Sequence, residues 1–106
     1  MILSPFQLAH YFYKDLIYIL MNANDDFEIM FAETYPNFTK KLVKLYGNLT
    51  YSEIRLCMLI RIGYPSNKIV EILNISTSTH ANLRSGIRKK MGLTRDQYLT
   101  NIILCI

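Results

Sequence analysis

The sequence predicts an all-α protein, and three observations carry that prediction. Signals for helix starts recur along the 106 residues, as Ser/Thr caps followed three positions later by Glu or Gln. Glycines stand where several of the expected helices should end. No segment shows the sustained alternation of apolar and polar residues that a half-buried strand requires. The length fits one domain, and an apolar content of 51% supports a packed core.

Three helices are expected in the first half of the chain. Ser4 begins a capping box with Pro5 at the first helical position. Asn24 provides a cap for the next helix, and the two aspartates after it favour a helix start through the helix dipole. Pro36 breaks the chain between the second and third helices, and Gly47 marks the end of the third. The expected ranges are 5–23, 25–35 and 37–46.

Four more helices are expected in the second half. Thr50 opens a capping box with Glu53, and Gly63 ends the helix that follows. Pro65 opens a turn, and a Ser/Thr-rich turn separates the next two helices. Gly92 ends the second of these, and a capping box that begins at Thr94 predicts the last helix. The expected ranges are 51–62, 66–73, 77–91 and 95–105.

The expected helix over 5–23 is apolar nearly all round and rich in aromatic residues. Such a helix must be buried on several sides, so we expect it to pack against a second copy and form a homodimer. The alternative is that it folds over the C-terminal helices of its own chain. Its polar and charged residues interrupt the run too often for a membrane span, and no secretory signal is evident.

Positive charge is concentrated in the second half of the chain. Residues 1–48 hold four Lys against five acidic residues, a net charge of −1. Residues 49–106 hold eight Lys and Arg against three acidic residues, a net charge of +5. This asymmetry favours a polyanionic partner for the second half, although a merely solubilising surface would look the same.

The helix expected over 77–91 is amphipathic, and it follows a short apolar helix and a tight turn, as in a helix-turn-helix. Its inward face is predicted to carry His80, Leu83, Ile87 and Met91. On the other face, the predicted base-facing residues are Ser78, Ala81, Asn82 and Ser85, and the predicted phosphate-binding residues are Ser76, Thr79, Arg84, Arg88, Lys89 and Lys90. The alternative is a solvated face on an ordinary helix with Ser76 as its cap.

A spaced set of residues from 49 to 93 matches a known pattern without a gap: Leu49, Thr50, Glu53, Leu56, Cys57, Leu59, Ile60, Gly63, Ile69, Leu73, Ile75, Ser76, Thr79, Ile87 and Lys90 to Leu93. With this set, the segment resembles the LuxR/FixJ-type helix-turn-helix domain, in the version found at the C-terminus of transcriptional regulators in Bacteroidetes. The resemblance implies a four-helix domain, dimeric operator binding and transcriptional control. It also implies that Ala81, Asn82 and Ser85 face base edges.

Several positions depart from that family: Asn67 and Lys68 replace its Lys-Glu pair, Val70 replaces a small residue, and two departures lie in the helix over 77–91. Ala81 stands where the family usually has a basic residue, and His80 stands where it has an apolar one. A short aliphatic side chain at position 81 cannot hydrogen-bond a base, so these departures weaken sequence-specific readout more than they weaken the fold. The predicted organisation is an N-terminal helical dimerisation segment over residues 1–48 and a LuxR-type DNA-binding domain over residues 49–106.

The function expected from these features is that of a homodimeric regulator that binds double-stranded DNA through the helix over 77–91. The alternatives are a helical interaction module that has lost sequence-specific DNA binding, and a sigma-factor-like promoter-binding fragment. No catalytic motif, cofactor site or small-molecule substrate is evident, and two His and two Cys residues make no metal site. Both cysteines have apolar neighbours and are expected to be buried reduced thiols in the cytoplasm.

Overall fold

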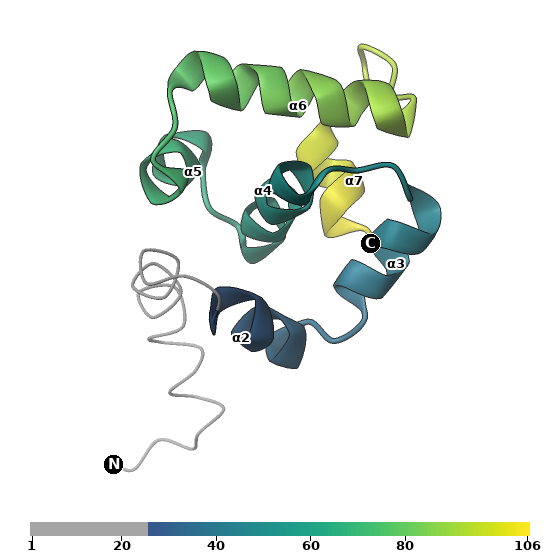
Figure 1. Ribbon diagram of the computed structural model, residues 1–106. Helices are drawn as coiled ribbons and strands as arrows, with labels where there is room; N and C mark the ends of the chain where they lie inside the picture. Colours follow the sequence, from purple (N-terminus) through teal and green to yellow (C-terminus); the bar gives the residue numbers. More distant parts are fainter. Residues whose placement is uncertain (1–25) are drawn as a thin grey trace, which may run out of the picture.

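A computed structural model describes residues 26–106 of the chain, and this part contains six α-helices and no strand (Figure 1). The predicted all-α class is therefore confirmed. The helices are α2 (Asp26–Thr34), α3 (Phe38–Leu45), α4 (Tyr51–Ile62), α5 (Ser66–Leu73), α6 (Thr77–Met91) and α7 (Leu99–Leu104). The helix predicted over 5–23, and the dimer contact assigned to it, lie outside the described residues. None of the six helices is long and apolar enough to cross a membrane.

The ends of α4, α5 and α6 coincide with the ranges predicted from sequence, and local capping residues define both ends of α4 and α6. Thr50 forms the complete capping box at the start of α4, where its side chain accepts a hydrogen bond from the backbone N–H of Glu53. Ser76 caps α6 in the same way through the N–H of Thr79. Gly63 and Gly92 end α4 and α6 in the left-handed conformation, with φ of 103° and 67°.

The predicted start of the last helix is wrong, since α7 begins at Leu99 and not at residue 95. Only half of the predicted capping box forms. The Gln97 side chain accepts from the Thr94 N–H at 2.9 Å, but the Gln97 N–H donates to the Thr94 carbonyl at 3.1 Å and closes a turn. Arg88 of α6 donates to the carbonyls of both residues and thereby holds the turn. These tertiary bonds favour a turn at the place where the local signal alone predicts a helix.

Helix α4 lies at the centre of the fold and packs against α5, α6 and α7, with α6 along one edge of the molecule (Figure 1). The core between these helices is apolar and fully buried at Leu56, Leu59, Ile69, Ile87 and Ile103. Phe31, Phe38 and Leu42 of α2 and α3 belong to the same core.

The first two described helices are also tied to the rest of the chain through a cation–π contact. The guanidinium of Arg61, near the end of α4, lies 4.8 Å from the ring centroid of Tyr35 in the turn after α2. Contacts therefore cross the boundary that the sequence predicts at residue 48.

Candidate nucleic-acid interface

Helices α5 and α6 are joined by a turn of three residues, Asn74 to Ser76. Asn74 adopts the left-handed conformation with φ of 53°, and the N–H of Ile75 reaches back to the carbonyl of Val70 at 3.1 Å. This hydrogen-bond pattern closes the end of α5 as a Schellman motif, with Asn in the place usually taken by Gly. Ser76 then caps α6 at once. The chain thus forms a helix, a tight turn and a second helix, as a helix-turn-helix requires.

The inner face of α6 is the one predicted from the helical pattern. Ile87 is fully buried, and His80 and Met91 are 7% and 9% exposed. Leu83 is partly buried against the same core. This face is held against α4, so the opposite face of α6 is fixed in its orientation.

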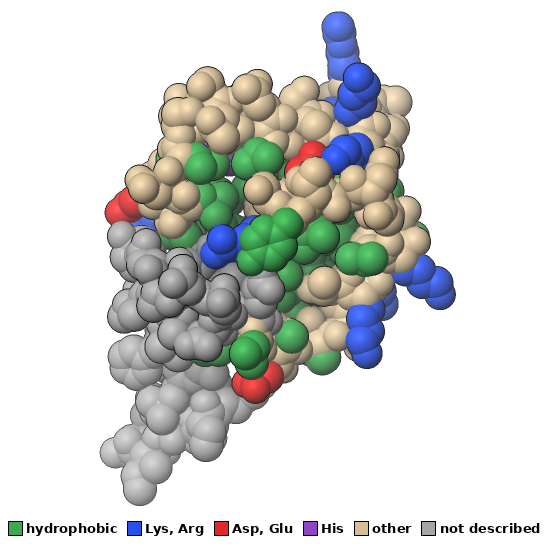
Figure 2. All heavy atoms as spheres, in the orientation of Figure 1, with side chains coloured by type: hydrophobic (Ala, Val, Ile, Leu, Met, Phe, Trp, Pro, Cys, Tyr) green, Lys and Arg blue, Asp and Glu red, His purple; other side chains and the backbone are tan. Residues whose placement is uncertain are grey.

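The outer face of α6 is exposed along its whole length. It carries Ser78, Ala81, Asn82, Ser85 and Lys89, all of which are exposed. Figure 2 shows mainly uncharged side chains and backbone over most of α6, while Lys and Arg side chains project at its C-terminal end. The four residues predicted to face bases therefore share one accessible surface. The term outer face is used below for this surface, which consists of Ser78, Ala81, Asn82, Ser85 and Lys89.

The start of α6 gathers three exposed hydroxyl groups. Ser76 Oγ lies 3.1 Å from Ser78 Oγ and donates to Thr79 Oγ1 at 2.9 Å. The same Oγ accepts the Thr79 N–H at 3.1 Å. The sequence predicts the Ser76 and Thr79 hydroxyls as phosphate ligands and Ser78 as base-facing. The structure places all three at the N-terminal end of α6, where the helix dipole attracts an anion.

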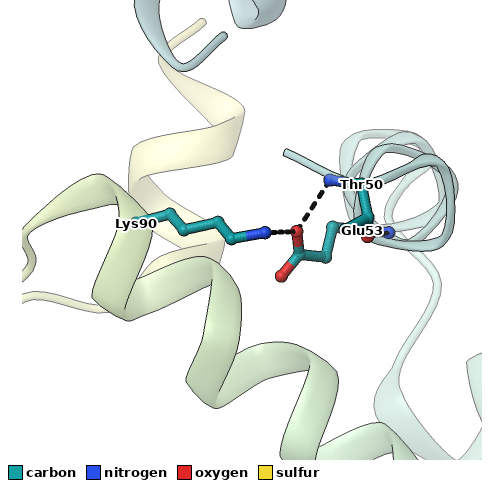
Figure 3. Close-up of polar contacts among 3 residues, drawn as sticks. All are labelled: Thr50, Glu53 and Lys90. Atoms are coloured by element: carbon teal, nitrogen blue, oxygen red, sulfur yellow. Dashed lines mark hydrogen bonds and ion pairs between the residues drawn. The ribbon is translucent and has the colours of Figure 1, made fainter. Parts of the chain in front are cut away.

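Lys90 is predicted to bind phosphate, but the structure gives it an internal partner. Its Nζ lies 2.6 Å from Oε1 of Glu53, which is buried at 5% exposure, and the lysine side chain is 28% exposed (Figure 3). The same Oε1 accepts the N–H of Thr50 at 2.8 Å. A single carboxylate thus caps α4 and ties it to α6.

Gly86 of α6 makes room for that carboxylate. A Cβ atom at this position would lie 2.9 Å from Glu53 Oε2, closer than side chains normally approach. The absence of a side chain at Gly86 thus leaves space on α6 for the Glu53 side chain of α4.

Two other cations of α6 also turn away from the outer face. Arg88 donates to the carbonyls of Gln97 and Thr94 at 2.6 and 2.7 Å. Arg84 is half-buried, and it lines a pocket between α4, α5 and α7. Of the four cations predicted to bind phosphate, only Lys89 is exposed on the outer face. Sequence reasoning missed these contacts because their partners lie on other elements.

The local environments shift the pKa values of several ionisable groups, among them Glu53, His80 and Cys57. Burial alone would raise the pKa of Glu53, but the hydrogen bonds from Lys90 and Thr50 outweigh it and lower that pKa. Burial, aided by the positive charge of Arg84, lowers the pKa of His80. Burial and then the Glu53 charge raise the pKa of Cys57 to about 12.

The predicted burial of the cysteines is confirmed for Cys57 and wrong for Cys105, which is exposed. The high pKa of Cys57 makes its thiol unreactive at neutral pH. Within residues 26–106, no cluster of three or more His, Cys, Asp or Glu residues is placed to hold a metal ion. The candidate nucleic-acid interface consists of the outer face of α6 and the hydroxyls at its start.

Comparisons with known proteins identify no relative of this chain. The chain matches no protein-family model, and no curated protein or solved structure is significantly similar to it.

Proposed function

We propose that the chain is a DNA-binding transcription regulator with a helix-turn-helix of the LuxR/FixJ type, and that the outer face of α6 enters the major groove. One observation carries this proposal. A helix held to the core by His80 and Ile87 presents small and polar side chains to solvent along its other side, directly after a three-residue turn. Such a surface fits closely against base edges, because short side chains leave room for the duplex.

The contacts that we propose are fewer than the sequence predicts. Asn82 is the one outer-face residue whose amide matches the donor and acceptor pair of adenine. Lys89 and the hydroxyls of Ser76, Ser78 and Thr79 would hold phosphates, which position the helix without specifying sequence. Arg88 bonds to a backbone carbonyl and Lys90 pairs with Glu53, so their charges act on DNA only at longer range. This division favours modest sequence specificity.

A homodimer formed through residues 5–23 completes the proposal. Two copies of α6 would then read half-sites about one helical turn apart, some 34 Å along the duplex. Each copy would add its own phosphate contacts, which raises affinity beyond what a single domain provides. A regulator of this kind would act in the cytoplasm of a bacterium.

The affinity for DNA tests the proposal. We expect fluorescence anisotropy to show that the full chain binds random-sequence duplex, with log K falling against log salt by about 0.9 for each phosphate contact. Lys89→Ala should weaken binding to every duplex and lower that slope. Lys40→Ala, on the exposed surface of α3, removes the same charge outside the helix-turn-helix and should change the slope little. The absence of binding at about 50 mM salt would refute the proposal.

A second candidate function is a protein-interaction module, and exposed apolar side chains favour it. Ile29 of α2 and Leu45 of α3 are 60% and 62% exposed, and Tyr98 before α7 is 70% exposed. Exposed apolar residues mark contacts with other proteins where they form one contiguous patch. In this case Ile29→Ser and Leu45→Ser would disrupt the assembly of the chain into larger species, as measured by light scattering. Lys89→Ala would have no effect on any activity of the chain.

A further inference from the structure

A pocket of about 320 Å³ lies where the end of α4 and the start of α5 meet α6 and α7. Its apolar walls come from Ile60, Ile69 and Leu104, and its polar groups include Ser66, Thr100 and Arg84. The volume lies at the lower end of the range for small-molecule sites. The pocket joins all four helices of the second half of the chain, and it does not include the outer face of α6.

Arg84 is the unusual member of this pocket. Its side chain is half-buried, and within residues 26–106 it forms neither a hydrogen bond nor an ion pair. The neighbouring cations of α6 behave differently, since Arg88 donates to two carbonyls and Lys90 pairs with Glu53. Burial, followed by the positive charge of Arg88, lowers the pKa of Arg84. A guanidinium in this position is stabilised by any anion that reaches it.

The lining of the pocket selects among anions. Among the residues that the structure describes, no Asp or Glu lines it, so no acidic group of this lining competes for Arg84. A guanidinium binds a carboxylate through two parallel hydrogen bonds, and the hydroxyls of Ser66 and Thr100 provide further donors. A phosphate monoester carries up to two negative charges, whereas the lining drawn from residues 26–106 has one cation and otherwise largely apolar walls. These features fit one carboxylate attached to a short apolar body.

We propose that this pocket is a binding site for a small organic carboxylate, with Arg84 on the carboxylate and the Ile60, Ile69 and Leu104 side chains around the apolar part. The inference goes beyond DNA binding and does not depend on it. Its ligand would touch both helices of the helix-turn-helix together with α4 and α7.

The test uses the full chain labelled with ¹⁵N and hexanoate as the probe. We expect saturable shifts of the amide signals of Gly63, Ser66 and Thr100 as hexanoate is added. Hexan-1-ol has the same apolar body without the charge, and it should bind at least about tenfold more weakly, a difference of about 1.4 kcal/mol. Hexylamine should produce no saturable shift at these amides.

Arg84→Met keeps an apolar stem in place of the guanidinium and should weaken hexanoate binding by at least about tenfold. Lys89→Met makes the same replacement on the outer face and should leave hexanoate binding unchanged. Thr100→Val replaces a hydroxyl with a methyl group at an exposed position and should weaken hexanoate binding about threefold. This variant provides a second test if Arg84→Met does not fold.

Three results would overturn the proposal. The first is no saturation by hexanoate up to about 50 mM, since millimolar binding is the weakest that a specific site should show. The second is equal affinity for hexan-1-ol, which would reduce the pocket to an apolar cleft. The third is tighter, Arg84-dependent binding of inorganic phosphate at the same amides, which would make the site a phosphate site. None of these measurements involves DNA, so their failure and the failure of the regulator proposal are separate.

Discussion

The carboxylate of Glu53 and the ammonium of Lys90 join the start of α4 to the last turn of α6, with Oε1 and Nζ 2.6 Å apart. The same oxygen accepts the Thr50 N–H, so one atom closes a helix cap and an interhelical ion pair (Figure 3). Because α4 is the central helix, this pair helps to fix how α6 lies on the core. The orientation of the outer face therefore depends in part on a contact on the other side of α6.

Removing the cation of that pair should destabilise the fold. Lys90→Met leaves the Glu53 carboxylate buried with only its cap hydrogen bond. We expect a loss of about 1–2 kcal/mol in the free energy of unfolding, discounted because Lys90 is partly exposed to solvent. Urea denaturation measures the loss. Lys89→Met, one position earlier and fully outside the pair, should change stability by less than about 0.5 kcal/mol. Equal effects of the two variants would contradict the account.

The effect of Gly86→Ala on the free energy of unfolding should depend on Glu53. Alanine normally stabilises a helix interior by about 0.5–1 kcal/mol relative to glycine. Here the added Cβ would lie 2.9 Å from Glu53 Oε2, and Lys90 and Thr50 restrain that side chain, so Gly86→Ala should destabilise the protein. Apart from its two chain neighbours and the backbone of its own helix, no other atom of the described residues lies within 4 Å of the new Cβ. In a Glu53→Ala background the same substitution should therefore become stabilising. A substitution effect of the same sign in both backgrounds would show that Glu53 does not restrict position 86.

The turn between α5 and α6 carries strain at Asn74. Its φ of 53° is a left-handed conformation that glycine adopts at little cost. We expect Asn74→Gly to raise the free energy of unfolding by up to about 1 kcal/mol and Asn74→Ala to lower it by a similar amount. Thermal or urea denaturation provides the measurement. If Ala were tolerated as well as Gly, the left-handed turn would not be the conformation in solution.

Burial of His80 should make stability fall in mild acid. Its Nε2 is buried and has no hydrogen-bond partner among the described residues, and burial lowers its pKa below the ordinary value of 6.5. Because the unfolded chain then binds the proton more readily, stability is complete above pH 6.5 and falls as the pH drops toward the folded pKa. Urea titrations at about pH 7.5 and about pH 5.5 should show this loss in the wild type and much less of it in His80→Leu.

Acid should act on Glu53 in a lower range. Since folding lowers its pKa from the ordinary value of 4.5, the stability that it contributes is present above that value and is lost as the pH falls further. The two groups therefore act in successive pH windows. Comparing Glu53→Gln with the wild type below pH 4.5 separates the second window from the first. A wild-type stability that did not fall between neutral pH and about pH 5 would contradict the His80 assignment, and one that did not fall further below pH 4.5 would contradict the Glu53 assignment.

Much of the fold could be predicted from sequence because its helix ends are chemically local. Thr50, Gly63, Ser76 and Gly92 act within one turn of their own positions, and α4, α5 and α6 have the predicted ranges. The start of α7 could not be predicted in the same way. At Thr94, the local signal competes with hydrogen bonds from Arg88, and those bonds depend on how α6 lies against the following turn.

In the candidate site, too, features that depend on local sequence could be predicted and features that depend on contacts between helices could not. Helical spacing is enough to separate His80 and Ile87 from Asn82 and Ser85, and the burial of these residues confirms the separation. The roles of the cations are not local. Lys90 pairs with a residue 37 positions away, and Arg84 lies in a pocket formed by three other helices. A basic run on a helix therefore overstates the charge that the helix offers to a partner.

The most direct test of the central claim is to map where duplex DNA contacts the protein. A titration of the ¹⁵N-labelled full chain with random-sequence duplex should shift amide signals at the start of α6 and at Ala81, Asn82, Ser85 and Lys89. Signals from the exposed surface of α2 and α3 should move little. Shifts confined to α2 and α3, or no shift at low salt, would contradict the assignment of the outer face as the DNA-binding surface.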